Sequence, residues 1–311
     1  MDRRLSALSG LRIGTRGSAL ALAQAETVAD GLDGAELVVI RTAGDEGGPS
    51  AARSDDKSRF VREIERALLD GDIDLAVHSA KDLPGELPEG LALAGVPPRA
   101  DPADVWIGPG GSIAEVPEGA RVGTASVRRR SQLLAVRPDL DVVELRGNVD
   151  TRLRKRADGE VDGIVLAAAG LERLGRSGES GFRFGLRALT PAAGQGALAL
   201  EARDDAGPAA AAAAADLTDR EALVELSAER AVVAGLGASC DTPVGVCARH
   251  DDGVLLIRGF AGLPDGSEHV YDEVRGDPDQ PVGLGEALVE RMLGAGAGEL
   301  LERASAGETD G

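Results

Sequence analysis

The chain has 311 residues, a formal net charge of −19 at pH 7 and 2% aromatic residues. This length exceeds that of one typical domain, so two or three domains are expected. The charge and the scarcity of aromatic rings argue against a nucleic-acid partner and against an anionic membrane surface, because both are bound mainly through Lys and Arg.

The composition also bears on where the protein works. Lys stands only at positions 57, 81 and 155, and together with the acidic excess this predicts a halophilic surface, although an acidic interaction face would give part of the same bias. Residues 1–11 hold no apolar run of signal-peptide length, and no stretch of about 18 apolar residues occurs. We therefore expect a cytoplasmic protein with no membrane partner.

Along the first third of the chain, short apolar runs alternate with segments of helical periodicity. The expected strands are 11–13, 37–42, 73–77 and 91–96, and the expected helices are 19–32 and 59–69. Strands that alternate with helices predict an α/β layer fold with a mainly parallel sheet.

A Pro-rich connector at 97–102 precedes a second alternating series. Its expected strands are 105–107, 121–123, 142–145 and 164–167, and its expected helices are 126–136 and 148–156. A second Pro- and Gly-rich crossing at 190–196 leads into a strand at 197–201. Two crossings predict a hinged pair of lobes, with the chain returning to the first lobe and a ligand site in the cleft.

The last third has a different pattern. Helices are expected at 209–215, from a capping box at Thr218 and Glu221 to 234, at 285–293 and at 299–304, with strands at 244–249, 254–260 and 269–274. This pattern predicts a small α+β domain. The expected domains are 10–100 with 196–216, 104–192 and 217–305.

Arginines gather where strands give way to helices. Arg128 and Arg129 follow Thr124 and Ser126 in the first turn of a helix, where cations oppose the helix dipole unless an anion binds there. Solvent-facing arginines on an acidic protein are the alternative.

Two more junctions carry the same pattern, with Arg146 and Arg152 at one and Arg16 and Ser18 at the other. Because the carboxyl ends of parallel strands share an edge, these arginines are expected to converge on one cleft. Several guanidinium groups without a Lys-containing phosphate loop favour a polycarboxylate ligand.

Two residues are candidates for the chemistry itself. Asp82 adjoins Lys81 and should stay ionised, so it could stabilise a developing cation, whereas a turn-capping role before Pro84 is the alternative. Cys240 lies in a loop after a helix and is the candidate nucleophile or attachment site, while Cys247 is expected to be a buried strand residue. No Cys or His spacing indicates a metal site.

In their order and spacing, these motifs resemble the hydroxymethylbilane synthase (porphobilinogen deaminase) family. The matching segments are TRGSALALAQA (15–25), FVREIERALL (60–69), DLAVHSAKDLP (74–84), VGTASVRRRSQL (122–133), LRGNVDTRL (145–153), AAAGLERLG (167–175), PAAGQGALA (191–199) and the cysteine loop ending at Gly245.

The resemblance implies two lobes folded like periplasmic binding proteins, with mixed, mainly parallel sheets, and a small α+β C-terminal domain that carries the cysteine. It implies a monomeric transferase of porphyrin and heme biosynthesis. A dipyrromethane cofactor would be joined by a thioether to Cys240. Four porphobilinogen molecules would be added one at a time with loss of ammonia, and hydrolysis would release the linear tetrapyrrole. A two-lobed binding protein for a small polycarboxylate or oxyanion is the alternative.

The resemblance also assigns roles to individual residues. Asp82 matches the catalytic carboxylate, and the residues matching the cofactor contacts are Ser18, Ser79, Lys81, Thr124, Ser126, Arg128, Arg129, Arg146 and Arg152. The residues matching the substrate contacts are Arg16, Arg173, Lys57 and Phe60, the last two at the end of a mobile loop over 44–56. The chain departs from the family pattern at Ala80, Ala125 and, beside the cysteine, at Ala238 and Ser239.

Overall fold

The computed structural model describes residues 10–40, 55–239 and 241–307, and for residues 55–60 it describes the backbone alone. The expected loop over 44–56 therefore lies largely outside the described residues, as do Cys240 and the side chains of Lys57 and Phe60. The chain forms two compact units. Unit 1 holds Met1–Ala100 and Ala197–Leu223, and unit 2 holds Asp101–Gly196 and Val224–Gly311.

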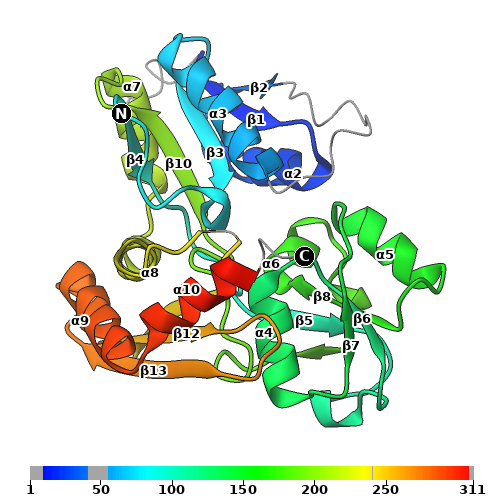
Figure 1. Cartoon of the computed structure of the whole chain (residues 1–311). Helices are drawn as coiled ribbons and strands as arrows, with labels where there is room; N and C mark the ends of the chain where they lie inside the picture. Colours follow the sequence, from blue (N-terminus) through cyan, green and yellow to red (C-terminus); the bar gives the residue numbers. More distant parts are fainter. Residues whose placement is uncertain (1–9, 41–54, 240, 308–311) are drawn as a thin grey trace. The chain divides into compact units, whose positions relative to one another are not determined.

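Unit 1 is built on a five-stranded sheet in the order β2-β1-β3-β10-β4 (Figure 1). The strands are β1 (Arg12–Arg16), β2 (Glu36–Ile40), β3 (Leu75–Ser79), β4 (Leu91–Gly95) and β10 (Leu198–Arg203). β1 is parallel to β2 and β3, whereas β10 is antiparallel to β3 and β4. The sheet is therefore mixed, and β10, the strand that follows the second crossing, runs antiparallel to both of its neighbours.

Helices cover both faces of this sheet. α2 (Ala19–Ala29) and α7 (Pro208–Leu217) share one apolar cluster with Val77 and Leu200, while α3 (Asp55–Leu69) packs Ile64 and Leu68 against Ala76 on the other face. Alternate residues of β3 thus face different helices, as strand geometry requires. A 3₁₀ turn, Ala80–Asp82, follows β3 directly.

Unit 2 repeats this plan in its first part, with the sheet order β7-β6-β8-β5-β9. The strands are β5 (Asp104–Ile107), β6 (Arg121–Gly123), β7 (Asp141–Val143), β8 (Gly163–Ala167) and β9 (Phe182–Arg183). The helices and 3₁₀ turns are η2 (Ile113–Glu115), α4 (Val127–Val136), α5 (Val149–Ala157), α6 (Ala168–Arg173) and η3 (Ser177–Glu179). β6 is parallel to β7 and β8, and β5, the strand after the first crossing, is antiparallel to β8 and β9.

The rest of unit 2 is a three-stranded antiparallel sheet with helices packed on it (Figure 1). Its strands are β11 (Val244–Asp251), β12 (Val254–Gly262) and β13 (His269–Gly276), and its helices are α8 (Arg220–Gly235), α9 (Pro281–Gly294) and α10 (Ala297–Gly307). One apolar cluster joins the helices to the sheet. The expectation of two α/β lobes with an added α+β part is confirmed, whereas the exact domain bounds stay a prediction.

Three local predictions need correction. α3 begins at Asp55 rather than at residue 59, so Lys57 and Phe60 lie in this helix and not at the end of a loop. β3 begins and ends two residues later than expected, so that His78 and Ser79 belong to the strand. Thr218 does not cap α8: its hydroxyl donates to the Ala214 carbonyl at 2.7 Å and accepts from the Val96 amide at 3.2 Å. Asp219 caps that helix instead, accepting from the Ala222 amide at 2.8 Å.

Candidate active site

The junction between β1 and α2 presents Arg16 and Ser18. Ser18 caps α2, because its hydroxyl accepts a hydrogen bond from the Ala21 amide at 3.3 Å. Thr15 is buried, and its hydroxyl donates to the Ala21 carbonyl at 3.1 Å, which also fixes this turn. The Arg16 side chain is thereby held at the carboxyl end of β1.

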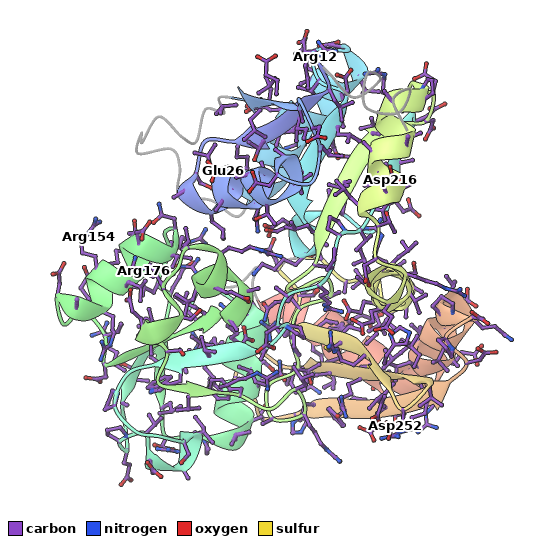
Figure 2. The ribbon with its side chains drawn as sticks, turned by 180° about the vertical axis from the view of Figure 1, so that it is seen from behind. Arg12, Glu26, Arg154, Arg176, Asp216 and Asp252 are labelled. Atoms are coloured by element: carbon purple, nitrogen blue, oxygen red, sulfur yellow. The ribbon has the colours of Figure 1, made fainter. Side chains whose placement is uncertain are left out.

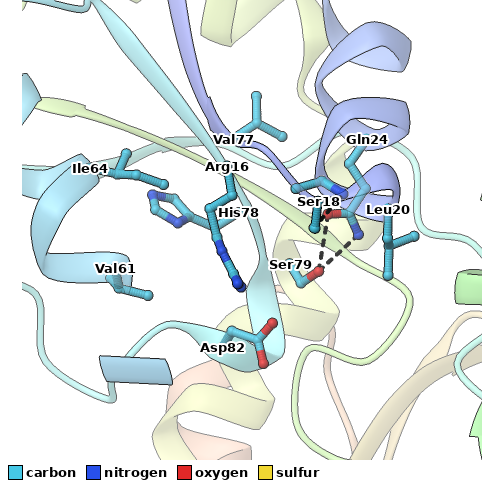
Figure 3. Close-up of a pocket in the computed structure, with 11 residues that line it drawn as sticks. Arg16, Ser18, Leu20, Gln24, Val61, Ile64, Val77, His78, Ser79 and Asp82 are labelled. Atoms are coloured by element: carbon cyan, nitrogen blue, oxygen red, sulfur yellow. Dashed lines mark hydrogen bonds between the residues drawn. The ribbon is translucent and has the colours of Figure 1, made fainter. Parts of the chain in front are cut away.

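The end of β3 lies at the same edge of the sheet, because β1 and β3 are parallel. The amide of Gln24 and the hydroxyl of Ser79 contact each other, with Nε2 and Oε1 at 2.8 and 3.2 Å from Oγ. This contact ties β3 to α2, and the turn that follows places Asp82 (Figure 3).

These groups line one cavity of about 80 Å³ in unit 1. Its lining residues are Arg16, Ser18, Leu20, Ala21, Gln24, Val61, Ile64, Val77, His78, Ser79 and Asp82. Figure 3 shows the Arg16 side chain extending from β1 toward the Asp82 carboxylate. A guanidinium group and a carboxylate at one small cavity can bind an anionic substituent and stabilise a cation beside it.

Three buried ionisable side chains lie at or beside this cavity. Nε2 of His78 lies 3.0 Å from Oε2 of Glu201, and their side chains are 4% and 0% exposed. Glu65 of α3 is also buried, and burial first and the charge of Glu201 second raise its pKa above the ordinary value. The sequence did not indicate this grouping, because the proximity of these side chains depends on the pairing of β3 with β10.

In unit 2, the anion that pairs with the arginines at the start of α4 is a carboxylate of the protein itself. Asp104 of β5, which is fully buried, accepts from Arg128 Nη2 at 2.9 Å and from Arg129 Nη2 at 2.7 Å. Burial opposes ionisation of Asp104, but the two guanidinium charges outweigh it and hold its pKa well below the usual range.

This pairing limits what else the two arginines can bind. Arg128 and Arg129 are 4% and 5% exposed, so in this structure a ligand could meet them only at an edge. Ser126 caps α4 by accepting from the Arg129 amide at 3.4 Å, and Thr124 accepts from the Ser126 amide at 3.1 Å. The hydroxyl groups therefore shape the junction from which the arginines project inward.

Arg152 differs from Arg128 and Arg129, whose guanidinium groups are paired with Asp104. Within the described part of the chain its buried Nε atom has no hydrogen-bond partner. Burial, and then the charge of Arg129, lower its pKa to about 10. A desolvated cation of this kind is stabilised by an anion, so Arg152 is suited to bind a carboxylate.

The other predicted residues of unit 2 lie near the same sheet edge. Arg173, at the end of α6, donates to the Gly196 carbonyl at 2.7 Å, and burial lowers its pKa. Arg146 is exposed and pairs with Glu144 at 2.6 Å. Gly147 has φ +128°, and a Cβ there would lie 2.7 Å from Thr151, so Gly is required at this turn.

The remaining candidates are placed less fully. Lys81 is half-buried in the turn before Asp82. Beside position 240, the Ser239 amide donates to Thr242 Oγ1 at 2.9 Å, and that hydroxyl donates to the Ser239 carbonyl at 2.7 Å. Ser239 and Thr242 are therefore joined by two hydrogen bonds.

The described residues, 10–40, 55–239 and 241–307, hold neither a metal-binding cluster nor a membrane-spanning helix. No group of three or more His, Cys, Asp or Glu residues there could hold a metal ion. No helix in those ranges is both long enough and apolar enough to span a membrane.

Comparisons with known proteins cover almost the whole chain. The family model described as "Porphobilinogen deaminase, dipyromethane cofactor binding domain" matches residues 11–210, and that described as "Porphobilinogen deaminase, C-terminal domain" matches 223–294. The porphobilinogen deaminase of Syntrophus aciditrophicus is 45% identical over 96% of this chain and 100% of that protein. That of Roseiflexus sp. is 48% identical over 94% and 98%. A TRAP periplasmic solute-binding protein from Desulfovibrio salexigens aligns at 11% identity with a TM-score of 0.40, over 68% of this chain and 72% of that one.

Proposed function

The chain belongs to the porphobilinogen deaminase family, and we propose on this premise how its own residues carry out the transferase reaction. The enzyme condenses four porphobilinogen molecules, one at a time and with loss of ammonia, onto a dipyrromethane primer held by a thioether to Cys240. Hydrolysis then releases the linear tetrapyrrole. The observation that carries this proposal is the presence of Arg16 and Asp82 at one cavity beside Ser18 and Ser79.

The described residues fit a cofactor that bears several carboxylates. Arg152 is a half-buried cation whose buried Nε has no hydrogen-bond partner among the described residues, and Arg173 lies in the same unit with a pKa lowered by burial. Further hydrogen-bond donors come from the cations Lys81 and Arg146 and from the hydroxyl groups of Ser18, Ser79, Thr124 and Ser126, each of which can donate one hydrogen bond. When bound, the dipyrromethane supplies the pyrrole carbon that is extended.

Asp82 is the proposed catalytic residue. Loss of ammonia from porphobilinogen leaves a cation. A fixed carboxylate beside the pyrrole nitrogen stabilises this cation and accepts a hydrogen bond from the pyrrole N–H. Arg16 binds a carboxylate substituent of the substrate and so aligns the ring with Asp82. Arg173, Lys57 and Phe60 complete the proposed substrate contacts.

In unit 2, Arg146 and Arg152 bind carboxylates of the growing chain directly. Arg128 and Arg129 contribute mainly through the positive charge left after two guanidinium groups share the single carboxylate of Asp104. This charge extends to Arg152, whose pKa the charge of Arg129 lowers. Each carboxylate so bound is worth roughly 1.5 to 3 kcal/mol.

We also propose a cytoplasmic monomer that binds no nucleic acid and works at high salt. The support is the net charge of −19 together with exposed acids such as Glu26, Asp216 and Asp252, which point outward (Figure 2). Activity that rises with KCl and a monomeric mass in solution would agree with this proposal. Activity highest in dilute buffer would contradict the salt adaptation.

The test is to incubate purified protein with porphobilinogen in high KCl and to measure ammonia and tetrapyrrole released. Asp82→Asn should lower kcat by about 10² to 10⁴-fold, whereas Asp82→Glu should retain more activity because it keeps the charge. Asp70→Asn, at an exposed site after α3, is the matched control. If the parent protein binds porphobilinogen but releases no ammonia, the chain is a binding protein instead.

A further inference from the structure

Two of the three places where the chain passes between the units are joined by one side chain. These two crossings fall at Ala100–Asp101 and Gly196–Ala197, and the third is at Leu223–Val224. On the unit 2 side, Nε2 of Gln195 donates to the Pro102 carbonyl at 2.7 Å and to Oδ1 of Asp104 at 2.8 Å. Gln195 is 1% exposed, so this link is sheltered from water.

The acceptor in this link, Asp104, is the residue that both arginines share. Its Oδ1 accepts from Gln195 and from Arg129, and its Oδ2 accepts from Arg128. Asp104 is the first residue of β5, so the ion cluster begins where the first crossing ends. Arg129 Nη1 also donates to the Val165 carbonyl at 3.0 Å, which anchors the cluster to the central strand β8.

Helix α4 also forms hydrogen bonds with the second crossing segment. Arg128 Nη1 donates to the Thr190 carbonyl at 2.6 Å, and Gln132 Nε2 donates to the same carbonyl at 2.9 Å. The Thr190 amide donates back to Gln132 Oε1 at 2.6 Å. One helix turn therefore holds both crossing segments through buried, charge-assisted contacts, which are among the stronger hydrogen bonds.

We propose that Asp104 is a positioning residue for the carboxylate-binding arginines of unit 2, and that Gln195 couples its position to the two crossing segments. Neither residue touches ligand in this scheme. Asp104 orients Arg128 and Arg129, and these set the charge near Arg152. The inference rests on the proposed function, because it takes the ligand carboxylates to be those of the dipyrromethane.

Charge and position predict opposite results when Asp104 is neutralised. Asp104→Asn removes a negative charge, so electrostatics alone would strengthen binding of a polycarboxylate. Positioning predicts that binding weakens, because Asn offers one acceptor oxygen in place of two and its NH2 group would face a donor of Arg128, Arg129 or Gln195. The direction of the change therefore separates the two explanations.

The experiment follows the loading of protein made without cofactor during incubation with porphobilinogen, with the adduct measured by intact mass. Asp104→Asn should load about tenfold more slowly, and Gln195→Met about fivefold more slowly, since each loses buried hydrogen bonds. Asp139→Asn, a second Arg-bound carboxylate of unit 2, and Gln280→Met, at an exposed site, are the matched controls and should load like the parent.

Circular dichroism and unfolding midpoints accompany each variant, so that rates are compared for folded protein. Gln195→Met keeps both ion pairs of Asp104, so its loading rate tests the inference if Asp104→Asn does not fold. Folded variants that load at the parent rate, or faster, would overturn the inference. A parent protein that gains no adduct would instead overturn the proposed function.

Discussion

His78 and Glu201 form a buried pair, with Nε2 and Oε2 3.0 Å apart between the sheet of unit 1 and α3. They are diagonal neighbours on adjacent antiparallel strands, since His78 lies opposite Ala199 and Glu201 opposite Ala76. Glu65 of α3 is buried on the same side of the sheet. Two carboxyl groups beside one imidazole are most stable when one carboxyl group keeps its proton.

The effect of replacing Glu65 on the free energy of unfolding should therefore depend on pH. Its pKa is raised by burial and by Glu201, and lowered less by His78 and Arg62, from an ordinary value of 4.5. The stability that protonated Glu65 provides is complete below pH 4.5 and is lost as pH rises through the folded-state pKa. Glu65→Gln should accordingly gain roughly 1 kcal/mol over the parent above that pKa, and less at lower pH.

Denaturant unfolding at several pH values measures this difference. The exposed Glu26→Gln serves as the control and should track the parent throughout. A gain for Glu65→Gln that does not change with pH would show that the pKa of Glu65 is the same in the folded and unfolded protein.

Arg152 should show a conflict between stability and binding. Its charged form is disfavoured by burial, so Arg152→Gln should stabilise the protein without cofactor by about 1 kcal/mol at pH 7. The same change should slow cofactor loading by about tenfold or more, because a charge-assisted contact to a carboxylate is lost. Thermal unfolding and the mass-based loading assay measure the two effects. A variant that is less stable than the parent would mean that Arg152 already has a compensating partner.

Gly163 should not tolerate a side chain. A Cβ there would lie 2.1 Å from Cη2 of the fully buried Trp106 ring, and the two residues lie on adjacent strands. Gly163→Ala should cost about 1 to 3 kcal/mol through overpacking.

Trp106 is the one Trp in the sequence, so its fluorescence reports unfolding of unit 2 directly. Gly178→Ala, where a Cβ would meet nothing within 4 Å, is the control. Equal midpoints for both variants would show that the ring can move aside.

Most of the helices and strands could be predicted from periodicity, and so could the junctions that carry Arg16, Asp82 and Arg152. The prediction failed where contacts join distant segments. Asp104 stands in an apolar strand and gave no sign that it binds Arg128 and Arg129, because that pairing needs β5 to lie antiparallel to β8. Residue types at a junction thus indicate the chemistry available, whereas the partners of buried charges depend on strand order.

The same limit explains the shift of β3. His78 and Ser79 are polar, and periodicity alone ends the strand before them. In the structure His78 is buried against Glu201, and Ser79 contacts Gln24. Both partners come from elements far along the sequence, so only the folded chain shows why polar residues belong in this strand.

The central claim is that the chain carries its primer on Cys240, and the intact mass of the purified protein tests it most directly. The account predicts an added mass of two porphobilinogens minus two ammonias, mapped to Cys240, absent from Cys240→Ser and retained in Cys247→Ser, whose side chain is buried. A parent protein without the adduct should gain it on incubation with porphobilinogen in high salt. An adduct that persists in Cys240→Ser, or a parent that never acquires one, would contradict the account.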